Sequence, residues 1–298
     1  MNEERVLYLE CKSGISGDMT VAALLDLGVD ESAFAATIES LGLEGVSYAI
    51  SKVDKNGITA RDFDVRIEGE NPAHEHHHHE HEHGHHHGHG HHEHEHRHEP
   101  HEHSHVHEHA AHEHRNFGAV RDIIEKSALS ERAKGIAVRT FEIVAEAEAK
   151  VHGKAIDEVH FHEVGALDSI MDIAAAAFCI DFLNVERIAV SVLSEGNGYV
   201  NCQHGRLPVP VPATSEIAAR YGIPLSITEC PYELITPTGI ALVAALKNTD
   251  SLPASFTIKK IGYGAGKRNL EHPNILRALL VEETGRTNSG PETDKQEP

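Results

Sequence analysis

The sequence predicts an α/β fold, with α+β as the alternative: a mixed sheet with flanking helices, interrupted by a disordered His-rich insertion. Two observations lead to this prediction. Strand patterns and helix patterns interleave along most of the chain, which is typical of α/β and α+β domains. Residues 74–114 hold 23 of the 28 histidines and almost no apolar side chains. Such a composition does not form a hydrophobic core.

The first 70 residues begin with a strand, because RVLYLEC at 5–11 is a short apolar run. SGISGD follows as a Gly-rich turn. MTVAALLDLG then predicts a helix, with Asp18 as its N-cap candidate and Gly28 as its stop. A second helix is expected at 31–41. VSYAISKV and ITARDFDVRIE alternate apolar and polar residues around DKNG, which predicts a β-hairpin.

The His-rich stretch divides the predicted body. We assign residues 1–70 to its strand–helix–hairpin part, 71–115 to the insertion, 116–283 to the remainder of the body and 284–298 to a disordered tail. Neutral imidazole binds Zn, Cu, Fe and Ni, so the insertion predicts a metal store or loading tether. A solvated linker that binds metal only incidentally is the alternative. The adjacent histidines that we expect to store metal are His76, His77, His78, His79, His85, His86, His87, His91 and His92.

Residues 116–283 continue the alternation of helices and strands. Helices are expected at 116–127, 130–151 and 167–183, followed by the strand RIAVSVL. GRLPVPVPATSE is expected to form a rigid, Pro-rich connection with Pro212 in the first turn of the next helix. The remaining elements are expected as a helix at 213–221, a short strand, a helix at 238–247 and strands at 256–262 and 275–281.

Charge and cysteine content exclude several classes of function. The net charge is −21, and without the nine Glu and one Arg of residues 74–114 it is still −13. An acidic body disfavours nucleic-acid partners and anionic membranes, and it suits cations such as metals. The four cysteines form no CxxC pair, and the first residues do not form a signal peptide. We therefore expect a cytoplasmic protein without a membrane-spanning segment.

VHFHEVGALDSIMD at 159–172 gives the strongest signal for a site outside the His-rich stretch. In an extended segment His160 and His162 share one face, next to Glu163. The following helix places Asp168 and Asp172 on one face. Imidazoles and carboxylates together suit a divalent cation or acid–base chemistry. The alternative is structural: Asp168 caps the helix with Ser169, Asp172 is solvated and the histidines are hydrogen-bonded.

Three Gly-rich segments are weaker signals. SGISGDM places Asp18 at a helix start, where it either caps the helix or binds a metal. Thr236, Thr238 and Gly239 begin another helix, and their hydroxyl and N–H groups suit a phosphate or ordinary capping. GYGAGKRN offers Lys267 and Arg268 to a phosphate, or it is a loop with solvated charges.

Five segments together resemble a known family. SGISGDM, HFHEVGALDSIMDI, LPVPVPAT, LITPTGIALV and GYGAGKRNLEHPNILRALL occur in the order found in the nickel-pincer cofactor nickel-insertion family, LarC. The resemblance extends from about residue 6 to residue 282. A His-rich insertion of variable length occurs at the same place in that family. Each segment is weak alone, but five in order are specific.

The resemblance implies an enzyme of the lyase class that completes the cofactor of lactate racemase-type enzymes. Its substrate would be pyridinium-3,5-bisthiocarboxylic acid mononucleotide. Nickel would be placed between the two sulfurs and bonded to a ring carbon, with CTP and Mn²⁺ or Mg²⁺ required. Forming that bond expels a ring proton, so a base is useful. By residue chemistry, we expect metal ligands at His160, His162, Glu163, Asp168 and Asp172, catalytic groups at His162, Glu163 and Asp18, and phosphate ligands at Thr236, Thr238, Gly239, Lys267 and Arg268.

One departure from the family affects the expected partners. Full-length relatives carry a further C-terminal domain that binds CTP, and this sequence resembles the N-terminal part alone. We therefore expect a separate or frameshift-joined C-terminal domain as partner, and an apo lactate racemase-type enzyme as cofactor acceptor. The sequence leaves the oligomeric state open, a homo-oligomer included. The alternative function is a non-catalytic nickel store or metallochaperone, which explains the His-rich stretch but not the other segments.

Overall fold

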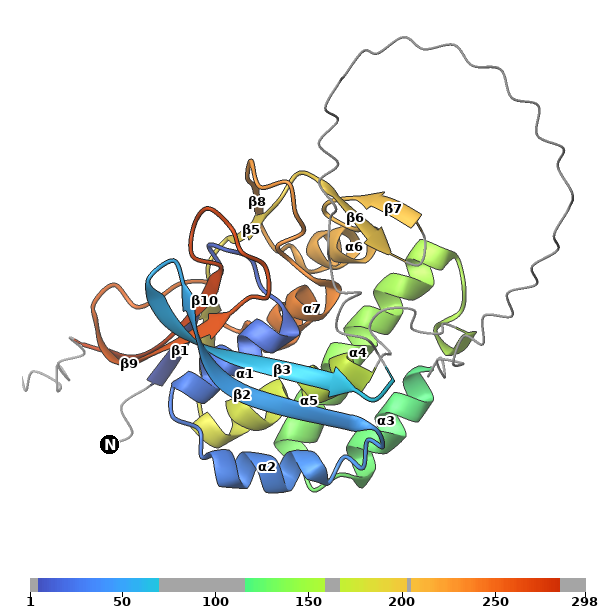
Figure 1. The fold of residues 1–298 in the computed structure, drawn as a ribbon, viewed down its shortest axis with the longest axis horizontal. Helices are drawn as coiled ribbons and strands as arrows, with labels where there is room; N and C mark the ends of the chain where they lie inside the picture. Colours follow the sequence, from blue (N-terminus) through green and yellow to red (C-terminus); the bar gives the residue numbers. More distant parts are fainter. Residues whose placement is uncertain (1–4, 70–115, 159–166, 203–204, 285–298) are drawn as a thin grey trace, which may run out of the picture. The chain divides into compact units, whose positions relative to one another are not determined.

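The computed structural model describes residues 5–69, 116–158, 167–202 and 205–284 (Figure 1). The predicted storage histidines lie outside these described residues, as do His160, His162 and Glu163. The described residues on both sides of the His-rich stretch belong to one unit of structure.

Within the described ranges, six strands form a mixed sheet, which confirms the predicted fold class. These strands are β1 (Arg5–Glu10), β2 (Val46–Lys55), β3 (Ile58–Ile67), β4 (Arg187–Val190), β9 (Phe256–Ala265) and β10 (Ile275–Glu283). Their order across the sheet is β2-β3-β9-β10-β1-β4. β1 is parallel to β4 and antiparallel to β10. The predicted hairpin is the β2–β3 pair, and it joins the rest of the sheet through β9.

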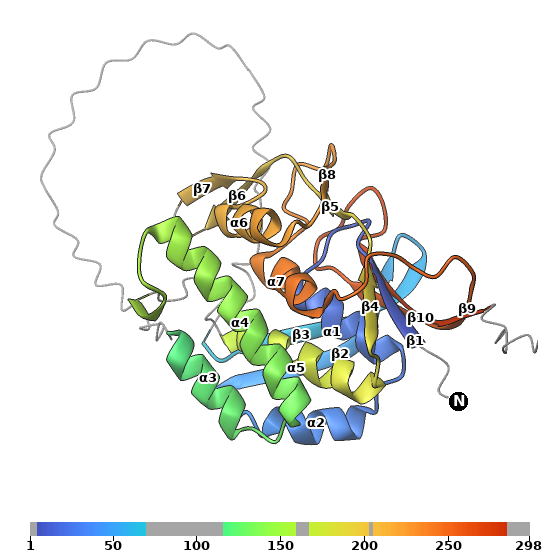
Figure 2. The same ribbon diagram turned by 180° about the vertical axis from the view of Figure 1, so that it is seen from behind.

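Helices pack against the sheet and against each other. The helices are α1 (Gly17–Asp26), α2 (Glu31–Glu39), α3 (Phe117–Lys126), α4 (Glu131–His152), α5 (Leu167–Leu183), α6 (Pro212–Tyr221) and α7 (Pro237–Leu246). α1 lies against β9, β3 and β10, and it also packs on α5. α4 packs against α5 and α7, and it lies on the side that faces the viewer in Figure 2. α5 is therefore enclosed, and its apolar sequence is buried on nearly every side.

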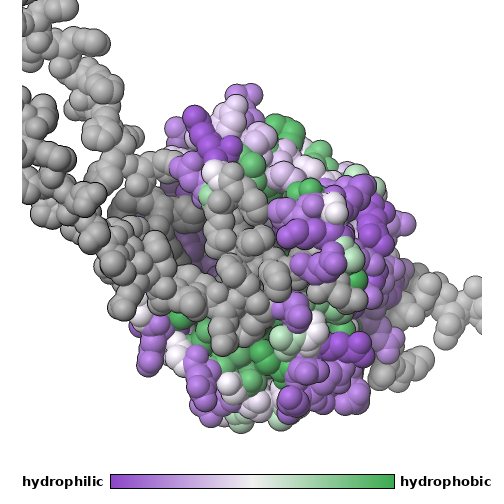
Figure 3. Space-filling view, turned by 90° about the vertical axis from the view of Figure 1, so that its right-hand side faces the viewer, coloured by the Kyte–Doolittle hydropathy of each residue, from purple (hydrophilic) through white to green (hydrophobic). Residues whose placement is uncertain are grey.

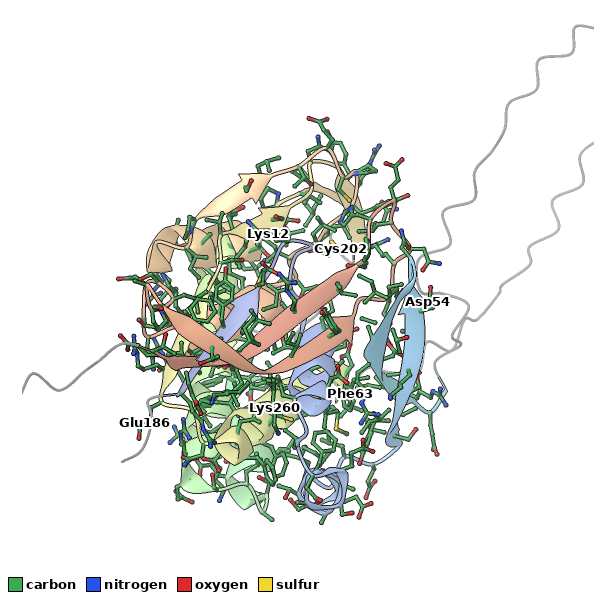
Figure 4. All side chains as sticks on the ribbon, turned by 90° about the vertical axis from the view of Figure 1, so that its left-hand side faces the viewer. Lys12, Asp54, Phe63, Glu186, Cys202 and Lys260 are labelled. Atoms are coloured by element: carbon green, nitrogen blue, oxygen red, sulfur yellow. The ribbon has the colours of Figure 1, made fainter. Side chains whose placement is uncertain are left out.

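The sheet buries its two faces unequally. Leu7 and Leu9 of β1 point into the main core with α1, whereas Val6 belongs to a small apolar cluster on the opposite face. Figure 4 views the strands with α1 behind them. On the side shown in Figure 3, most of the described surface is hydrophilic, with a hydrophobic area low on that face.

α1 approaches β9 very closely, and glycines make that approach sterically feasible. A Cβ at Gly264 would lie 2.0 Å from the Met19 carbonyl oxygen, and one at Gly262 would lie 2.1 Å from the Ala23 carbonyl oxygen. Both contacts are with backbone, which cannot move aside as a flexible side chain can. α1 therefore packs directly against the backbone of β9 at the GYGAG segment.

The connection between β4 and α6 differs from the sequence expectation. The expected strand RIAVSVL is not continuous: β4 ends at Val190, and the last residue of RIAVSVL begins β5 (Leu193–Glu195). β5 pairs in parallel with β8 (Leu225–Ile227). β6 (Tyr199–Cys202) and β7 (Gly205–Pro208) pair antiparallel, and β7 occupies the first residues of the stretch expected to be a Pro-rich connection. These strands are only three or four residues long, too short for an alternating pattern to stand out. Pro212 begins α6 as predicted. No helix in the described ranges has the length and apolar character needed to cross a membrane.

The close contact between α1 and β9 leads to a stability prediction. Gly264→Ala should destabilise the protein by about 1–3 kcal/mol, because its Cβ collides with helix backbone. Gly135→Ala is the matched control, since Gly135 is exposed in α4 and a Cβ there meets nothing within 4 Å. The control should stabilise the protein by about 1 kcal/mol through helix propensity. Chemical denaturation measures both, and equal effects of the two substitutions would contradict this account of the contact.

Candidate functional site

The start of α1 carries Asp18, but not in the predicted role. Ser16 occupies the N-cap position and its side chain makes no capping hydrogen bond. Asp18 lies in the first turn, where its Oδ1 accepts hydrogen bonds from the Ser16 hydroxyl and from the Met19 backbone N–H at 2.8 Å. The prediction that Asp18 is the N-cap is wrong, because the helix begins at Gly17, two residues earlier than expected, with Ser16 as its N-cap.

Asp172 of α5 reaches the same place from the neighbouring helix. A Cβ on Gly17 would lie 2.5 Å from the Asp172 Oδ2, so only glycine allows this approach. The backbone N–H of Asp18 donates to the Asp172 carboxylate. The other oxygen, Oδ1, is sealed from water and has no hydrogen-bond partner among the described atoms. The alternative in which Asp172 is merely solvated is therefore wrong.

Asp168 lies at the exposed start of α5, one turn before Asp172. Its Oδ1 accepts a hydrogen bond from the Ser169 backbone N–H at 2.8 Å. The residue is in the first turn and not at the N-cap, since α5 already begins at Leu167. Asp168 is close enough to raise the pKa of Asp172 through its charge, so the predicted shared face of these two aspartates is confirmed.

Burial makes the two inner carboxyls hard to ionise. Burial raises the pKa of Asp18, against the lowering effects of the Ser16 and Met19 hydrogen bonds and of the Lys267 charge. Burial also raises the pKa of Asp172 well above its usual range, and the charges of Asp18 and Asp168 raise it further. The positive end of the α1 dipole partly compensates. A cation bound between these carboxyls would favour their ionised forms and so offset the effect of burial.

Lys267 is a cation whose charge lowers the pKa of both Asp18 and Asp172. It follows β9, and its Nζ donates to Asp62 Oδ1 at 2.9 Å, to Asp64 Oδ1 at 3.0 Å and to the Phe63 carbonyl oxygen at 3.1 Å. Burial alone would lower the pKa of Lys267, but its carboxylate partners raise it. Phe63, labelled in Figure 4, lies on the hairpin strand β3. Lys267 is therefore a charged link between the hairpin and the acidic site.

The other predicted phosphate ligands are already engaged within the protein. The Thr236 side chain caps α7 by accepting a hydrogen bond from the Gly239 backbone N–H at 3.1 Å, so it fulfils the capping alternative. Thr238 is buried. A Cβ on Gly239 would lie 2.2 Å from the Ile15 carbonyl oxygen, so this glycine packs against the loop before α1. The Arg268 guanidinium lies over the Tyr232 ring at 5.1 Å.

The described residues leave the metal site incomplete. Among them, no group of three or more His, Cys, Asp and Glu side chains is arranged to hold a metal ion. The predicted ligands His160, His162 and Glu163 lie outside the described residues and just before α5 in the chain. Of the predicted metal ligands and catalytic groups, Asp18 and Asp172 are the two that the described structure brings into direct contact.

Sequence reasoning missed several polar residues. Asp62 and Asp64 alternate along β3, and this period-two pattern was a usable signal that both point to one side. Lys55 donates to the Arg268 carbonyl oxygen and to Asn269 Oδ1, contacts between residues more than 200 positions apart. Glu195 is completely buried at the end of β5. No local pattern marks these last two residues, because long-range contacts alone define their surroundings.

Comparisons with known proteins agree with the order of the sequence segments. The model of a family described as "Nickel insertion protein" matches residues 7–297. A pyridinium-3,5-bisthiocarboxylic acid mononucleotide nickel insertion protein of Alkaliphilus metalliredigens is 50% identical over 277 residues, 93% of this chain and 60% of that protein. Its namesakes from Acetivibrio thermocellus and Clostridium acetobutylicum are 39% and 45% identical, over 93% and 94% of this chain and 60% and 64% of theirs. The chain thus spans about 60% of the length of these relatives. No solved structure matches.

The half-buried aspartate pair predicts a pH-dependent effect on stability. The folded-state pKa of Asp172 is raised, so the unfolded chain releases this proton at lower pH, near 4. Above that pH the unfolded chain ionises at Asp172 while the folded protein keeps this carboxyl protonated, so the free energy of unfolding falls. Asp172→Asn should raise the thermal midpoint of the metal-free protein by several degrees at neutral pH, and the gain should grow as pH rises above about 4.

Asp168→Asn is the matched control, because Asp168 is exposed and lies on the same helix face. It should shift the midpoint far less than Asp172→Asn does, because it removes only the contribution of the Asp168 charge to the pKa of Asp172. The measurement is thermal unfolding in the presence of a chelator across pH 4–8. A wild-type protein and an Asp172→Asn variant with the same pH dependence would show that the Asp172 carboxyl is not under this constraint.

Proposed function

The chain belongs to the nickel insertion protein family, and we propose that it inserts nickel into pyridinium-3,5-bisthiocarboxylic acid mononucleotide, the substrate that the relatives' names state. The observation that carries the proposal is the pair of Asp18 and Asp172. Two carboxylates meet at a helix start, and one buried oxygen has no hydrogen-bond partner among the described residues. A buried polar atom without a partner is costly unless a ligand satisfies it. A divalent cation is the ligand that such a site would take.

We propose that nickel is held before transfer by these carboxylates together with His160, His162 and Glu163. Imidazole and carboxylate groups bind nickel without the soft thiolate ligands that would retain it. Asp168, one turn before Asp172, would complete the set from the exposed side. Binding of Ni²⁺ would offset the mutual repulsion of the aspartates, which is the main unfavourable feature of the metal-free site besides burial.

The reaction requires a proton acceptor as well as a metal site. Nickel joins two sulfurs of the substrate and replaces a proton on the ring carbon, so one C–H bond breaks, one Ni–C bond forms and one proton leaves. We propose that His162 or Glu163 accepts this proton, with Asp18 as the third candidate. Burial raises the pKa of Asp18, and a carboxylate with a raised pKa is the better base. The product would be the cofactor of a lactate racemase-type enzyme, and the class would be lyase.

CTP and Mn²⁺ or Mg²⁺ enter this proposal through a partner domain. In the described part of the chain, Lys267 already has three acceptors and Thr236 already caps α7. A phosphate would have to displace those contacts. The phosphate-binding role of Thr236, Thr238, Gly239, Lys267 and Arg268 therefore stays a prediction. We propose that nucleotide binding resides in a C-terminal domain outside this chain, and that insertion requires both parts.

A nickel store or metallochaperone is the second candidate, and the His-rich stretch is the observation that favours it. It does not account for the aspartate pair, which lies in the folded part of the chain. The two candidates make different predictions for removal of residues 74–114. A store would lose its function, whereas an insertase would lose only capacity for metal.

Deleting residues 74–114 should lower the number of Ni²⁺ ions bound per chain by several and leave the thermal midpoint nearly unchanged. The stretch supplies imidazoles but almost no apolar surface, so it adds metal capacity without adding to the core. Equilibrium dialysis gives the stoichiometry and calorimetry gives the midpoint. Unfolding of the deleted chain would refute the assignment of this stretch as a linker.

The insertion activity itself can be reconstituted. We expect the purified chain, supplied with Ni²⁺, CTP, Mn²⁺, the bisthiocarboxylate mononucleotide and a C-terminal domain of a relative, to activate an apo lactate racemase. His162→Ala should reduce this activation by at least about a hundredfold, the scale of a lost acid–base group, with an unchanged thermal midpoint. His272→Ala, at an exposed loop position, is the control and should be fully active. A fully active double variant His160→Ala/His162→Ala would remove both histidines from the site.

A further inference from the structure

Glu195 is a buried carboxylate that the proposed chemistry does not use. The residue is completely buried at the end of β5. Its Oε1 accepts hydrogen bonds from the backbone N–H groups of Gly196 at 2.8 Å, Leu234 at 2.8 Å and Ile235 at 3.2 Å. Its Oε2 is buried and has no hydrogen-bond partner among the described atoms. Burial raises the pKa of Glu195 even though the three N–H donors lower it. An apolar residue of similar size would avoid this cost, so a role in local geometry needs to be considered.

The segment that Glu195 holds is paired with the loop before α1. The Ile15 N–H donates to the Leu234 carbonyl oxygen at 2.9 Å, and the Thr236 N–H donates to the Ile15 carbonyl oxygen at 3.1 Å. These two bonds form a short parallel bridge between Ile15 and Ile235. β5, the strand that bears Glu195, contacts the other end of the same loop: the Ser194 N–H donates to the Cys11 carbonyl oxygen at 3.0 Å.

Steric contacts leave this pairing little freedom. A Cβ on Gly14 would lie 1.9 Å from the Leu234 carbonyl oxygen, and Gly239 packs on Ile15 in the same way. The loop continues through Ser16, whose hydroxyl donates to Asp18. Residues 11–16, which include Lys12 as labelled in Figure 4, therefore connect the bridge directly to the site aspartate.

We propose that Glu195 is a positioning residue for Asp18: by holding Leu234 and Ile235 it fixes the loop 11–16, and that loop sets where α1 begins. The inference rests on the proposed function, because it treats Asp18 as a site residue. It also explains why SGISGDM and LITPTG both contain glycine where they do. Gly14 of the first segment packs against the Leu234 backbone, and Gly239 of the second packs against the Ile15 backbone. Glu195, which belongs to neither segment, bonds the backbone of the second.

Two substitutions distinguish the effect of the length of the Glu195 side chain from the effect of its charge. Glu195→Gln keeps an acceptor oxygen at the same distance and removes the charge. Glu195→Asp keeps the charge but is one methylene shorter, so it cannot bond Gly196, Leu234 and Ile235 together. Thr214→Val is the matched control. Thr214 is equally buried and its hydroxyl donates to the Ile235 carbonyl oxygen at 3.4 Å, but it makes no bond to the N–H groups that Glu195 holds.

The experiment measures amide hydrogen exchange of the full chain together with the reconstituted insertion activity. Glu195→Asp should speed exchange of the Ile15 and Thr236 amides about tenfold, the effect of unmaking one or two buried hydrogen bonds, while the β2–β3 amides stay as in the wild type. Insertion activity should fall by a similar factor. Glu195→Gln should stay within about threefold of the wild type in both measurements, as should Thr214→Val.

Unchanged exchange at Ile15 in Glu195→Asp would overturn the inference, as would equal loosening by Glu195→Gln. Faster exchange in Glu195→Asp with full insertion activity would also overturn it, because Glu195 would then hold the loop without affecting the site. The exchange measurement requires no nickel. An inactive wild-type protein would therefore reject the proposed function, whereas exchange results contrary to these expectations would reject the role of Glu195.

Discussion

The close approach of α1 to its neighbours is the constraint on which the rest of the structure depends. Gly262 and Gly264 bring the helix onto the sheet, and Gly17 allows the Asp172 carboxylate of α5 to reach its first turn. A single Cβ at any of these positions would meet another residue at 2.5 Å or less. The start of α1 is thus fixed by β9 on one side and by α5 on the other. Asp18 therefore occupies a defined position relative to Asp172, which loop geometry alone would not ensure.

The unfavourable electrostatic interactions of Asp18 and Asp172 lie where α1 packs most closely against its neighbours. Burial raises the pKa of both inner aspartates, with a further rise from the charge of Asp62 at Asp18 and from the charges of Asp18 and Asp168 at Asp172. The stabilising contributions of the α1 dipole and of Lys267 do not reverse the direction of either shift. A site optimised for stability would replace one aspartate by an amide or an apolar residue. The retained carboxylates therefore favour a cationic ligand over a purely structural role. Lys267 limits the excess charge from the side of the hairpin, where Asp62 and Asp64 hold it in place.

Local patterns were sufficient to predict most elements of the fold. The β2–β3 hairpin follows from its alternation, and the boundaries of α5 follow from a long apolar segment that begins with Leu167. Patterns failed where pairing partners are distant. The strands β6 and β7 are too short to show a period, and Asp18 was assigned to the N-cap because Ser16, the actual cap, lies in a Gly-rich turn. The site was predicted only as a set of residue types. Spacing indicates that Asp168 and Asp172 share a face, but not that Asp172 meets Asp18 across two helices.

The same distinction explains which of the recognisable segments bear chemistry and which support it. LITPTG presents hydroxyl and N–H groups at a helix start, a pattern that by itself suits a phosphate. In the folded chain Thr236 caps α7, and Gly239 packs on Ile15. The backbone of the segment pairs with the loop before α1. Backbone groups that are already paired in this way have little capacity left for a ligand. The described contacts of this segment therefore link it to the loop before α1, whereas Asp18, Asp172 and Lys267 lie on α1, on α5 and just after β9.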